Sequence, residues 1–574
     1  MKKFLLILSL FMSLALVSCF GSTVCNQHRD TDDNGFCDEC NIQYEDGQDH
    51  SHKVVNGFCE ICNLPESSPG LEFSLNYDNT YTLTGLGSCK DSDIIVGIYK
   101  NADVTEIYMN AFQDSDISSI TLTQAVKFVD NYAFAYCENL QCVKISDSLI
   151  HIGYGVFSGC SALNEIIVDE NNANYQSIDG NLYTKDGKTL IKYASGKEAT
   201  QFDVPIEVIN IDPYAFDSSL NLKNINLPDN IKKIGSYAFS GCFFLSDFNV
   251  PDSVTEIGSN AFNFCLNLEK ITIGQNVGEI GFSTFSYCTK LKKINVHKNN
   301  SSYKSLDGTL YTKDGKILIK CPSNNAITLF CIPDGVEKIS DQAFHGCINL
   351  TDIRISNSVT SIGWYAFAEC SNLANINLPD NIQSIGYDAF RNTAYFNDKT
   401  NWDGECLYNN NFLIKSNSTI SGNYIIPDGI KIIAGGAFSD CVRLTSVTIP
   451  DSVQYIGSDA FLNTGFYNNE SNWENGGLYI GNCLISVKET ISGHYAIKSG
   501  TVLVQDDTFD LSATELKSLY IPSSVKYIPS NTLAYHYDLT QIYYEGTKSQ
   551  WGELYGIVSD NCTINCTDGP YSNN

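Results

Sequence analysis

The stretch IGSYAFSGC, residues Ile234–Cys242, decides the fold, because close copies of it return along most of the chain. The copies read IGSNAFNFC, IGFSTFSYC, ISDQAFHGC and IGWYAFAEC. Their phenylalanines recur at a basic 23-residue step, with one step of 22, two of 59, two of 48 and a last step of 24. The steps of 59 and 48 are one repeat plus a 36-residue or a 25-residue insertion. The repeat positions are Phe112, Phe134, Phe157, Phe216, Phe239, Phe262, Phe285, Phe344, Phe367, Phe390, Phe438, Phe461 and Phe509, with Leu533 in the last place. A fixed period in the twenties predicts a solenoid.

Each repeat can be read as one coil of an α/β solenoid. Leu222–Pro228 alternates apolar and polar residues, as a short half-buried strand does. The P-D-N or P-D-S that follows is typical of a turn. We expect the Ala-Phe segment to form a single helical turn. One coil cannot bury its own apolar face, so about 14 coils must stack. Their parallel strands, ~4.8 Å apart, would form one sheet of roughly 60 Å.

The unit L-x-x-I-x-[IVL]-P-[DS]-S-V-x-x-I-G-x-x-A-F-x-x-C resembles the 23-residue leucine-rich repeat of the BspA-like bacterial surface proteins. Residues Leu71–Cys89 resemble the amino-terminal lead-in of that family, and Ile542–Leu554 with the following CTDG resemble its carboxy-terminal cap. The resemblance covers about residues 70 to 570. It implies a leucine-rich repeat superhelix, display outside the cell and binding of proteins or surfaces. It implies no catalytic residues.

Residues 1–18 are predicted to be a lipoprotein signal peptide. Two lysines precede a short apolar run that ends in Leu16-Val17-Ser18-Cys19, which is typical of an export signal and too short for a membrane span. The ending resembles a bacterial lipobox, and this resemblance implies that Cys19 carries the lipid. An ordinary signal peptide with a chance cysteine is the alternative. We therefore expect an exported protein, anchored to the bacterial membrane or outer surface through Cys19.

Residues 19–66 are rich in cysteine and histidine. Their spacing permits two four-coordinate structural zinc sites, since soft thiolates and imidazoles are typical zinc ligands. The first set is Cys25, His28, Cys37 and Cys40, and the second is His50, His52, Cys59 and Cys62. A mixed disulfide arrangement is the alternative. A calcium loop over Asp30–Gly35 is a weaker reading, because Asn41 stands where that loop needs a bidentate acid.

The four insertions come in two matched pairs. The 36-residue pair carries YQSIDGNLYTKDGKTLIKY and YKSLDGTLYTKDGKILIKC, at an offset of 128, and Lys-Asp-Gly-Lys between β-rich runs predicts a hairpin. The 25-residue pair repeats at an offset of 71, which aligns Trp402 with Trp473. Their repetition favours a packing role for these tryptophans over sugar stacking.

Eight cysteines stand three places after a repeat phenylalanine. They are Cys137, Cys160, Cys242, Cys265, Cys288, Cys347, Cys370 and Cys441. Other coils place Ser115, Ser219 or Thr393 there, so we interpret these thiols as small buried fillers. On a helical side with axes roughly 8–10 Å apart they would also be too distant for disulfides.

The strand face is the predicted binding surface, because solenoids usually bind partners on such a strip. Its candidate residues are Asn224, Asn226, Asn249, Thr272, Asn295, Arg354 and Asn377. The net charge of −29, from 65 acidic and 36 basic residues, disfavours nucleic acid as a partner. We find no catalytic constellation and expect no enzyme.

The predicted organisation is a signal peptide (1–18), a Cys/His-rich stalk (19–66), an amino-terminal lead-in (67–102), the repeat solenoid with its hairpin insertions (103–545) and a carboxy-terminal cap and tail (546–574). We expect a surface protein that binds an extracellular protein, a glycan or a host or bacterial surface. The alternative is a structural envelope solenoid that self-associates or spaces other components.

Overall fold

The computed structural model describes residues 54–55, 57–59, 62–488, 490–509, 516–529, 532–533, 538–554 and 561–571. It shows a β-solenoid of about 20 turns with very little helix. The chain forms two compact units, Met1–Lys223 with Asn230–Phe243, and Asn224–Asp229 with Phe244–Asn574. The predicted signal peptide, Cys19 and six predicted metal ligands (Cys25, His28, Cys37, Cys40, His50 and His52) lie outside the described residues.

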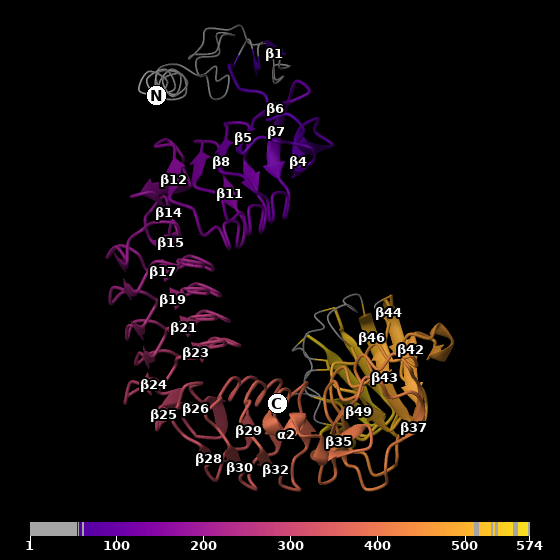
Figure 1. The fold of residues 1–574 in the computed structure, drawn as a ribbon. Helices are drawn as coiled ribbons and strands as arrows, with labels where there is room; N and C mark the ends of the chain where they lie inside the picture. Colours follow the sequence, from indigo (N-terminus) through magenta and orange to yellow (C-terminus); the bar gives the residue numbers. More distant parts are fainter. Residues whose placement is uncertain are drawn as a thin grey trace. The chain divides into compact units, whose positions relative to one another are not determined.

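Each coil contributes two short strands to two parallel ladders. In the second unit, β20 (Asp247–Asn249), β22 (Lys270–Ile273) and β24 (Lys293–Val296) form the first ladder. Strands β21 (Glu256–Ile257) and β23 (Glu279–Ile280) pair in the second, as β17 (Asn210–Ile211) and β19 (Lys233–Ile234) do in the first unit (Figure 1). Ile271 and Ile273 point into the core and are fully buried, which matches the predicted alternation. The second ladder was not predicted.

The Ala-Phe segment is not helical, so that prediction is wrong. Asn260 and Phe264 have φ values of 57° and 56°, in the left-handed region that interrupts a right-handed helix. The amide of Phe262 therefore donates to the Thr284 carbonyl of the next coil, at 3.0 Å. These bonds form a third ladder between coils. Within the described residues, helix is confined to α2 (Ala394–Asn397), α3 (Lys548–Trp551) and two 3-10 turns, η1 (Lys399–Asn401) and η2 (Glu470–Asn472).

Successive coils are as close on the turn side as strands are in a sheet. The ring centroids of Phe344 and Phe367 lie 5.0 Å apart, and those of Phe367 and Phe390 lie 5.5 Å apart. The expected 8–10 Å spacing is wrong, because turns joined by backbone hydrogen bonds replace helices, and the distance argument against disulfides fails with it. The eight repeat cysteines are nevertheless all buried, as predicted. Cys370 Sγ donates to the Phe344 carbonyl of the preceding coil at 3.0 Å.

The 36-residue insertions form the predicted hairpins and also join the solenoid. In the second unit they are β25 (Tyr303–Leu306), β26 (Thr309–Thr312) and β27 (Ile317–Lys320), with Gly315 at φ 85° in the turn. Strand β27 pairs in parallel with β29 (Lys338–Ile339), so the insertion adds a turn of its own. Added turns of this kind raise the count from the predicted 14 to about 20.

The same hairpin ends the first ladder at β24. The amide of Ile294 donates to the carbonyl of Gly308, in the β25–β26 turn, at 2.9 Å. The matching hairpin of the first unit, β13 (Tyr175–Ile178) with β14 (Asn181–Thr184), acts alike, since Ile166 donates to Gly180 at 2.9 Å. The predicted unbroken sheet of roughly 60 Å is therefore wrong, and the first ladder consists of separate short sheets.

The 25-residue insertions pack their tryptophans. The first contains α2, η1, β34 (Trp402–Asp403), β35 (Cys406–Asn409) and β36 (Phe412–Ser416), and the second contains η2, β41 (Trp473–Glu474), β42 (Gly477–Ile480) and β43 (Cys483–Val487). Trp402 Nε1 donates to the Phe396 carbonyl and Trp473 Nε1 to the Tyr467 carbonyl, each at 2.9 Å. Both rings are half-buried, which supports the packing role.

The ends of the described chain are built from hairpins. At the amino end, β1 (Val54–Val55) pairs with β2 (Phe58–Cys59), and β3 (Glu72–Leu75) pairs with β4 (Tyr81–Gly85). At the carboxyl end, β48 (Thr563–Cys566) joins β47 (Gln541–Tyr544) and pairs with β49 (Gly569–Tyr571). None of the helices that the structure describes is long and apolar enough to cross a membrane.

Candidate functional site

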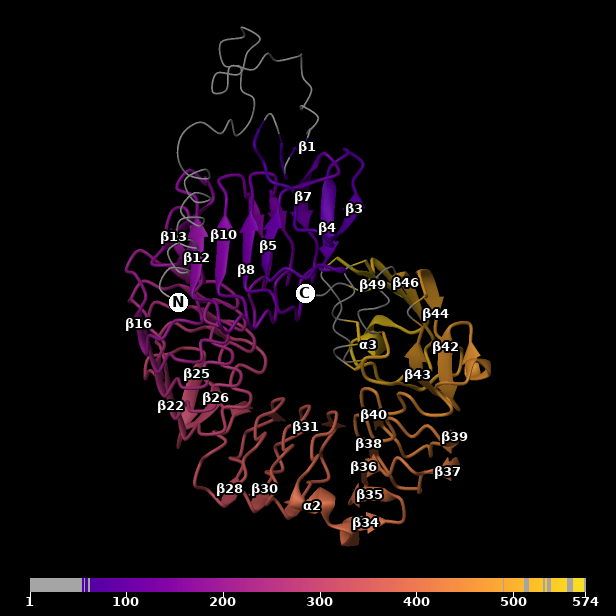
Figure 2. The same ribbon diagram turned by 45° about the horizontal axis from the view of Figure 1, so that its top comes forward.

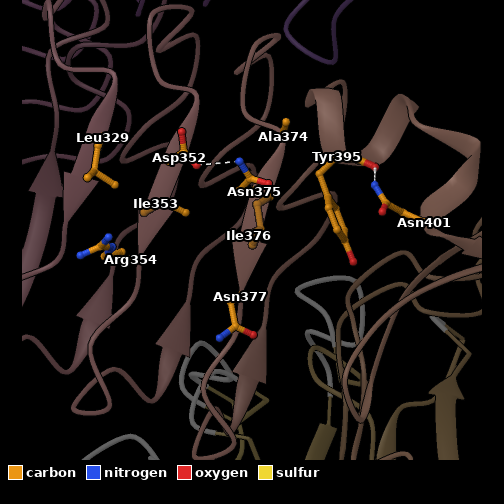
Figure 3. A pocket seen from close by; sticks show the side chains of 10 residues that line it. All are labelled: Leu329, Asp352, Ile353, Arg354, Ala374, Asn375, Ile376, Asn377, Tyr395 and Asn401. Atoms are coloured by element: carbon orange, nitrogen blue, oxygen red, sulfur yellow. Dashed lines mark hydrogen bonds between the residues drawn. The ribbon is translucent and has the colours of Figure 1, made fainter.

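A polar hollow of about 620 Å³ lies on the strand face of the second unit. Its floor is the parallel sheet of β28 (Leu329–Cys331), β30 (Asp352–Arg354) and β32 (Asn375–Asn377). Helix α2 of the first 25-residue insertion stands beside this sheet (Figure 2), and turn η1 follows α2 in the chain. The residues that line the hollow are Leu329, Asp352, Ile353, Arg354, Ala374, Asn375, Ile376, Asn377, Tyr395 and Asn401 (Figure 3).

Strand alternation places the polar side chains of the hollow in two rows. Phe330, Ile353 and Ile376 are in register and buried in the core. Their neighbours therefore face outward. One outward row is Leu329, Asp352 and Asn375, and the other is Cys331, Arg354 and Asn377.

Asp352 is held as an anion at one side of the hollow. Thr351 Oγ1 donates to its Oδ2 at 2.7 Å, and Asn375 Nδ2 donates to its Oδ1 at 2.6 Å. These hydrogen bonds, first that of Thr351 and then that of Asn375, lower the pKa of the carboxyl, and the charge of Arg354 adds to them. Both oxygens of Asp352 are thus already engaged within the protein.

Arg354 and Asn377 present the donors that remain available. Both side chains are exposed, and neither makes a hydrogen bond or ion pair with any residue that the structure describes. A guanidinium offers five N–H donors and an amide offers two donors and an acceptor. This pair can bind a carboxylate, a carbonyl or a hydroxyl group.

Tyr395 forms a fixed aromatic wall. Its Oη donates to the Tyr408 carbonyl at 2.8 Å and accepts from Asn409 Nδ2 at 3.1 Å. Asn401 Nδ2 donates to the Tyr395 carbonyl at 2.9 Å, so helix α2 and turn η1 are tied together. The ring faces the hollow in an orientation set by these bonds (Figure 3).

The predicted strand-face residues fall into separate groups instead of one strip. Arg354 and Asn377 line the hollow. Asn249, Thr272 and Asn295 form one register row across β20, β22 and β24. That row ends at the β25–β26 hairpin. The remaining two, Asn224 and Asn226, are exposed on β18 (Asn224–Asn226).

The two described cysteines of the predicted metal module sit in a small apolar cluster. Cys59 and Cys62 are buried with Ile98. The Asn63 amide donates to the Cys59 carbonyl at 3.0 Å. The described part of the chain contains no group of three His, Cys, Asp or Glu side chains suited to a metal. Six of the eight predicted ligands lie outside that part.

Sequence reasoning missed Tyr395 and Asn401. Both belong to an insertion, where the 23-residue period gives no register for a side chain. Their repetition in the second 25-residue insertion as Phe466 and Asn472 was a usable signal. Asn472 Nδ2 donates to the Phe466 carbonyl at 2.8 Å, in the same way.

Comparison with known proteins identifies the family. The family described as BspA type leucine-rich repeat region matches residues 90–186, 192–306, 316–419 and 409–540. No curated protein matches the chain.

Similar solved structures include a leucine-rich cell surface protein from Faecalibacterium prausnitzii, which is 22% identical with a TM-score of 0.36 over 85% of this chain and 97% of that one. A leucine-rich repeat protein from Eubacterium ventriosum is 18% identical with a TM-score of 0.35, over 71% of this chain and 96% of that one. The pneumococcal vaccine antigen PcpA is 17% identical with a TM-score of 0.32, over 89% and 98%. Because the family match spans most of the sequence, the chain belongs to the BspA-type leucine-rich repeat family.

Proposed function

We propose that this protein is displayed outside a bacterial cell and binds an extracellular protein, a glycan or a cell surface through its strand face. The observation that carries the proposal is the hollow over β28, β30 and β32, where Arg354 and Asn377 present unused donors beside the fixed ring of Tyr395. Polar groups arranged around an aromatic wall are typical of specific binding sites. Family membership supports a role in molecular interaction.

Attachment through a lipid at Cys19 belongs to the same proposal. It rests on the short apolar run and the L-V-S-C ending. Acyl chains contribute about 0.8 kcal/mol per buried methylene, so dual acylation suffices for stable anchoring. The test is mass spectrometry of the protein from its native membrane, with Cys19→Ser as the variant that should appear unlipidated.

Two structural zinc ions in residues 19–66 are a further part of the proposal. Cys59 and Cys62 belong to one buried cluster and fit a pair of neighbouring thiolate ligands, which zinc sites commonly use. Elemental analysis of the purified full chain should give two zinc ions per molecule. Replacing Cys59 and Cys62 by serine should leave one.

The binding proposal is tested with the labelled full chain in mild detergent, against matrix proteins, mucins, glycans and whole cells. Arg354→Gln and Asn377→Ala should each weaken the strongest saturable interaction by about tenfold, a loss of ~1.4 kcal/mol. Arg443→Gln is the matched control, because Arg443 is also exposed but lies outside the hollow.

Light scattering on the same samples distinguishes the alternative. Concentration-dependent oligomers without any foreign partner would overturn the proposal in favour of a structural envelope solenoid. Saturable binding that survives both hollow variants would also overturn the assignment of the site.

A further inference from the structure

A second hollow, of about 320 Å³, lies on the turn side of the second unit. It forms where the 36-residue insertion separates the coil of Phe285 from the coil of Phe344. The insertion supplies strand β27 at this level but no Ala-Phe turn, so one layer of the turn ladder is missing. Phe282, Ile317 and Ile319 provide apolar walls, and Ser286, Lys338 and Gln342 provide polar groups.

The matched insertion of the first unit leaves the same gap, but tyrosines fill it. Tyr132, Tyr154 and Tyr214 meet there, with ring centroids 5.1 to 6.0 Å apart. The hydroxyls of Tyr132 and Tyr214 lie 3.1 Å apart and form a hydrogen bond across the gap. The hollow that remains beside Tyr154 and Tyr214 measures only about 30 Å³.

A glycine makes room for these three tyrosines, which together are called the plug. A Cβ atom at Gly155, which has φ 60°, would lie 2.6 Å from Cε1 of Tyr132. The ring of Tyr132 therefore lies over the backbone of the next coil and reaches Tyr214, beyond the insertion.

The duplicated positions of the second unit have lost the plug. The offset of 128 between the two insertions aligns Tyr132 with Asn260, Gly155 with Ser283 and Tyr214 with Gln342. Only the third ring remains aromatic, since Phe282 stands for Tyr154. Phe282 is 54% exposed and forms one wall of an open site.

We propose that the turn-side hollow between the coils of Phe285 and Phe344 is a binding site for a tyrosine side chain presented by a partner protein. The partner's ring replaces the plug that the first unit supplies from its own chain. The apolar walls accept the face of the ring. Gln342 Oε1 already accepts from Ser286 Oγ, so Gln342 Nε2 is the donor that remains for the hydroxyl, in the place where the plug has its tyrosine–tyrosine hydrogen bond. Aromatic side chains buried in such pockets contribute a large share of interface binding energy.

This site is independent of the strand-face hollow, because the two share no lining residue. The proposal therefore stands whether or not Arg354 and Asn377 bind a ligand.

The test is a titration of the full chain with N-acetyl-tyrosinamide, followed by saturation-transfer difference NMR, with N-acetyl-leucinamide as the comparison. We expect saturable binding of the tyrosine probe and at least tenfold weaker binding of the leucine probe. The variant Asn260→Tyr, Ser283→Gly, Gln342→Tyr transplants the plug into the second unit and is called the closing variant. It should weaken binding of the tyrosine probe at least tenfold. Asn276→Tyr adds a tyrosine at an exposed position outside the hollow and should change nothing.

If the closing variant does not fold, the reverse substitutions in the first unit, called the opening variant, still test the proposal. Tyr132→Asn, Gly155→Ser, Tyr214→Gln should create a second tyrosine site and double the stoichiometry. Equal binding of both probes, retention of binding by a folded closing variant, or an unchanged stoichiometry in a folded opening variant would each overturn the proposal.

Discussion

At the scale of single residues, buried lysines compensate for turns that the insertions lack. Lys192 is 2% exposed, and its Nζ donates to the carbonyls of Asp217 at 2.9 Å and Tyr214 at 3.2 Å. In the second unit Lys320 Nζ donates to the Gln342 carbonyl at 2.8 Å. Burial lowers the pKa of Lys192, opposed by the charge of Asp217. At the Asp217 carbonyl the ammonium group thus replaces the backbone amide that an ordinary preceding coil supplies, as Phe264 does for the Ser286 carbonyl.

We expect Lys192→Met to lower the free energy of unfolding by about 2 to 4 kcal/mol, because it removes two hydrogen bonds made by a buried, charged donor. Urea denaturation at pH 7 measures the change. Lys188→Met, at an exposed position of the same hairpin, should stay within about 0.5 kcal/mol of the parent. A Lys192→Met variant as stable as the parent would show that desolvation of the lysine cancels its bonds.

These lysines show what the sequence contained and what it concealed. The tripeptide Leu-Ile-Lys ends at Lys192, Lys320 and Lys415, and only the fourth insertion differs, with Ser486. The recurrence was visible in the sequence. Its role was not, because a lysine in a hairpin is normally solvated, and only the missing turn layer places it inside.

The buried thiols make a prediction about alkaline stability. Burial raises the pKa of Cys288 to about 12, whereas an unfolded thiol ionises near pH 9. Between these values the unfolded chain loses a proton that the folded chain keeps, so stability is full below pH 9 and falls as pH rises through this window. In this window the free energy of unfolding of Cys288→Ser should fall with pH by about 1.4 kcal/mol per pH unit less than that of the parent. Parallel pH profiles of the parent and the variant, from urea midpoints at pH 7 to 11, would contradict the prediction.

At the scale of the coil, close approach of neighbouring backbones explains the Ile-Gly pair. A Cβ atom at Gly281 would lie 2.3 Å from the Ser259 amide nitrogen of the preceding coil, and one at Gly363 would lie 2.4 Å from that of Asp341. Directly after an insertion the preceding turn is absent or shifted. The same place then holds another residue, namely Asp212, Ser340, Ala434 or Gln505. Near the two ends of the solenoid, this place is also not glycine, since it holds Tyr108, Asp130 or Pro529.

Gly281→Ser should therefore destabilise the protein by about 1 to 3 kcal/mol, because the two backbones must move apart. Ser340→Ala, at the equivalent place after the insertion, should cost less than about 0.5 kcal/mol. Thermal unfolding followed by circular dichroism compares the two variants. Equal losses in both would refute the role of close approach.

The period of the coil could be predicted from the sequence, but its secondary structure only in part. Alternation in Leu222–Pro228 correctly indicated the first strand. The spacing of alanine, phenylalanine and cysteine suggested a helical turn. Non-glycine residues such as Tyr214, at φ 60°, adopt left-handed conformations here, and no propensity rule assigns that to tyrosine. Bonds to the next coil stabilise this conformation, and those partners stand a whole repeat away in the sequence.

At the scale of the whole molecule, each coil is stabilised by its contacts with the neighbouring coils. Each 36-residue insertion leaves a seam, a junction at which turn-side backbone hydrogen bonds between coils are missing. Asn260, Phe262 and Phe264 each donate a backbone bond to the following coil. One coil later, within the described residues, the amides of Ser283, Phe285 and Tyr287 make no backbone hydrogen bond. In the first unit a side chain bridges the corresponding gap, since Asp217 Oδ2 accepts from the Gly159 amide at 2.7 Å. In the second unit the corresponding residue is His345, whose ring contacts Tyr287 with centroids 4.9 Å apart. Ser286 Oγ donates to Gln342 Oε1 nearby.

Stability in such a solenoid is a sum of coil and interface contributions, so the weakest interface should open first. We expect native-state hydrogen exchange to be fast at Phe285 and slow at Phe262, although the two are equivalent in the repeat and both side chains are buried. The closing variant Asn260→Tyr, Ser283→Gly, Gln342→Tyr should slow exchange around Phe285 by bridging the seam with aromatic contacts, while Asn276→Tyr should not. Uniform exchange at the two positions would mean that the solenoid opens as one cooperative unit, and that the third ladder of hydrogen bonds does not set its local stability.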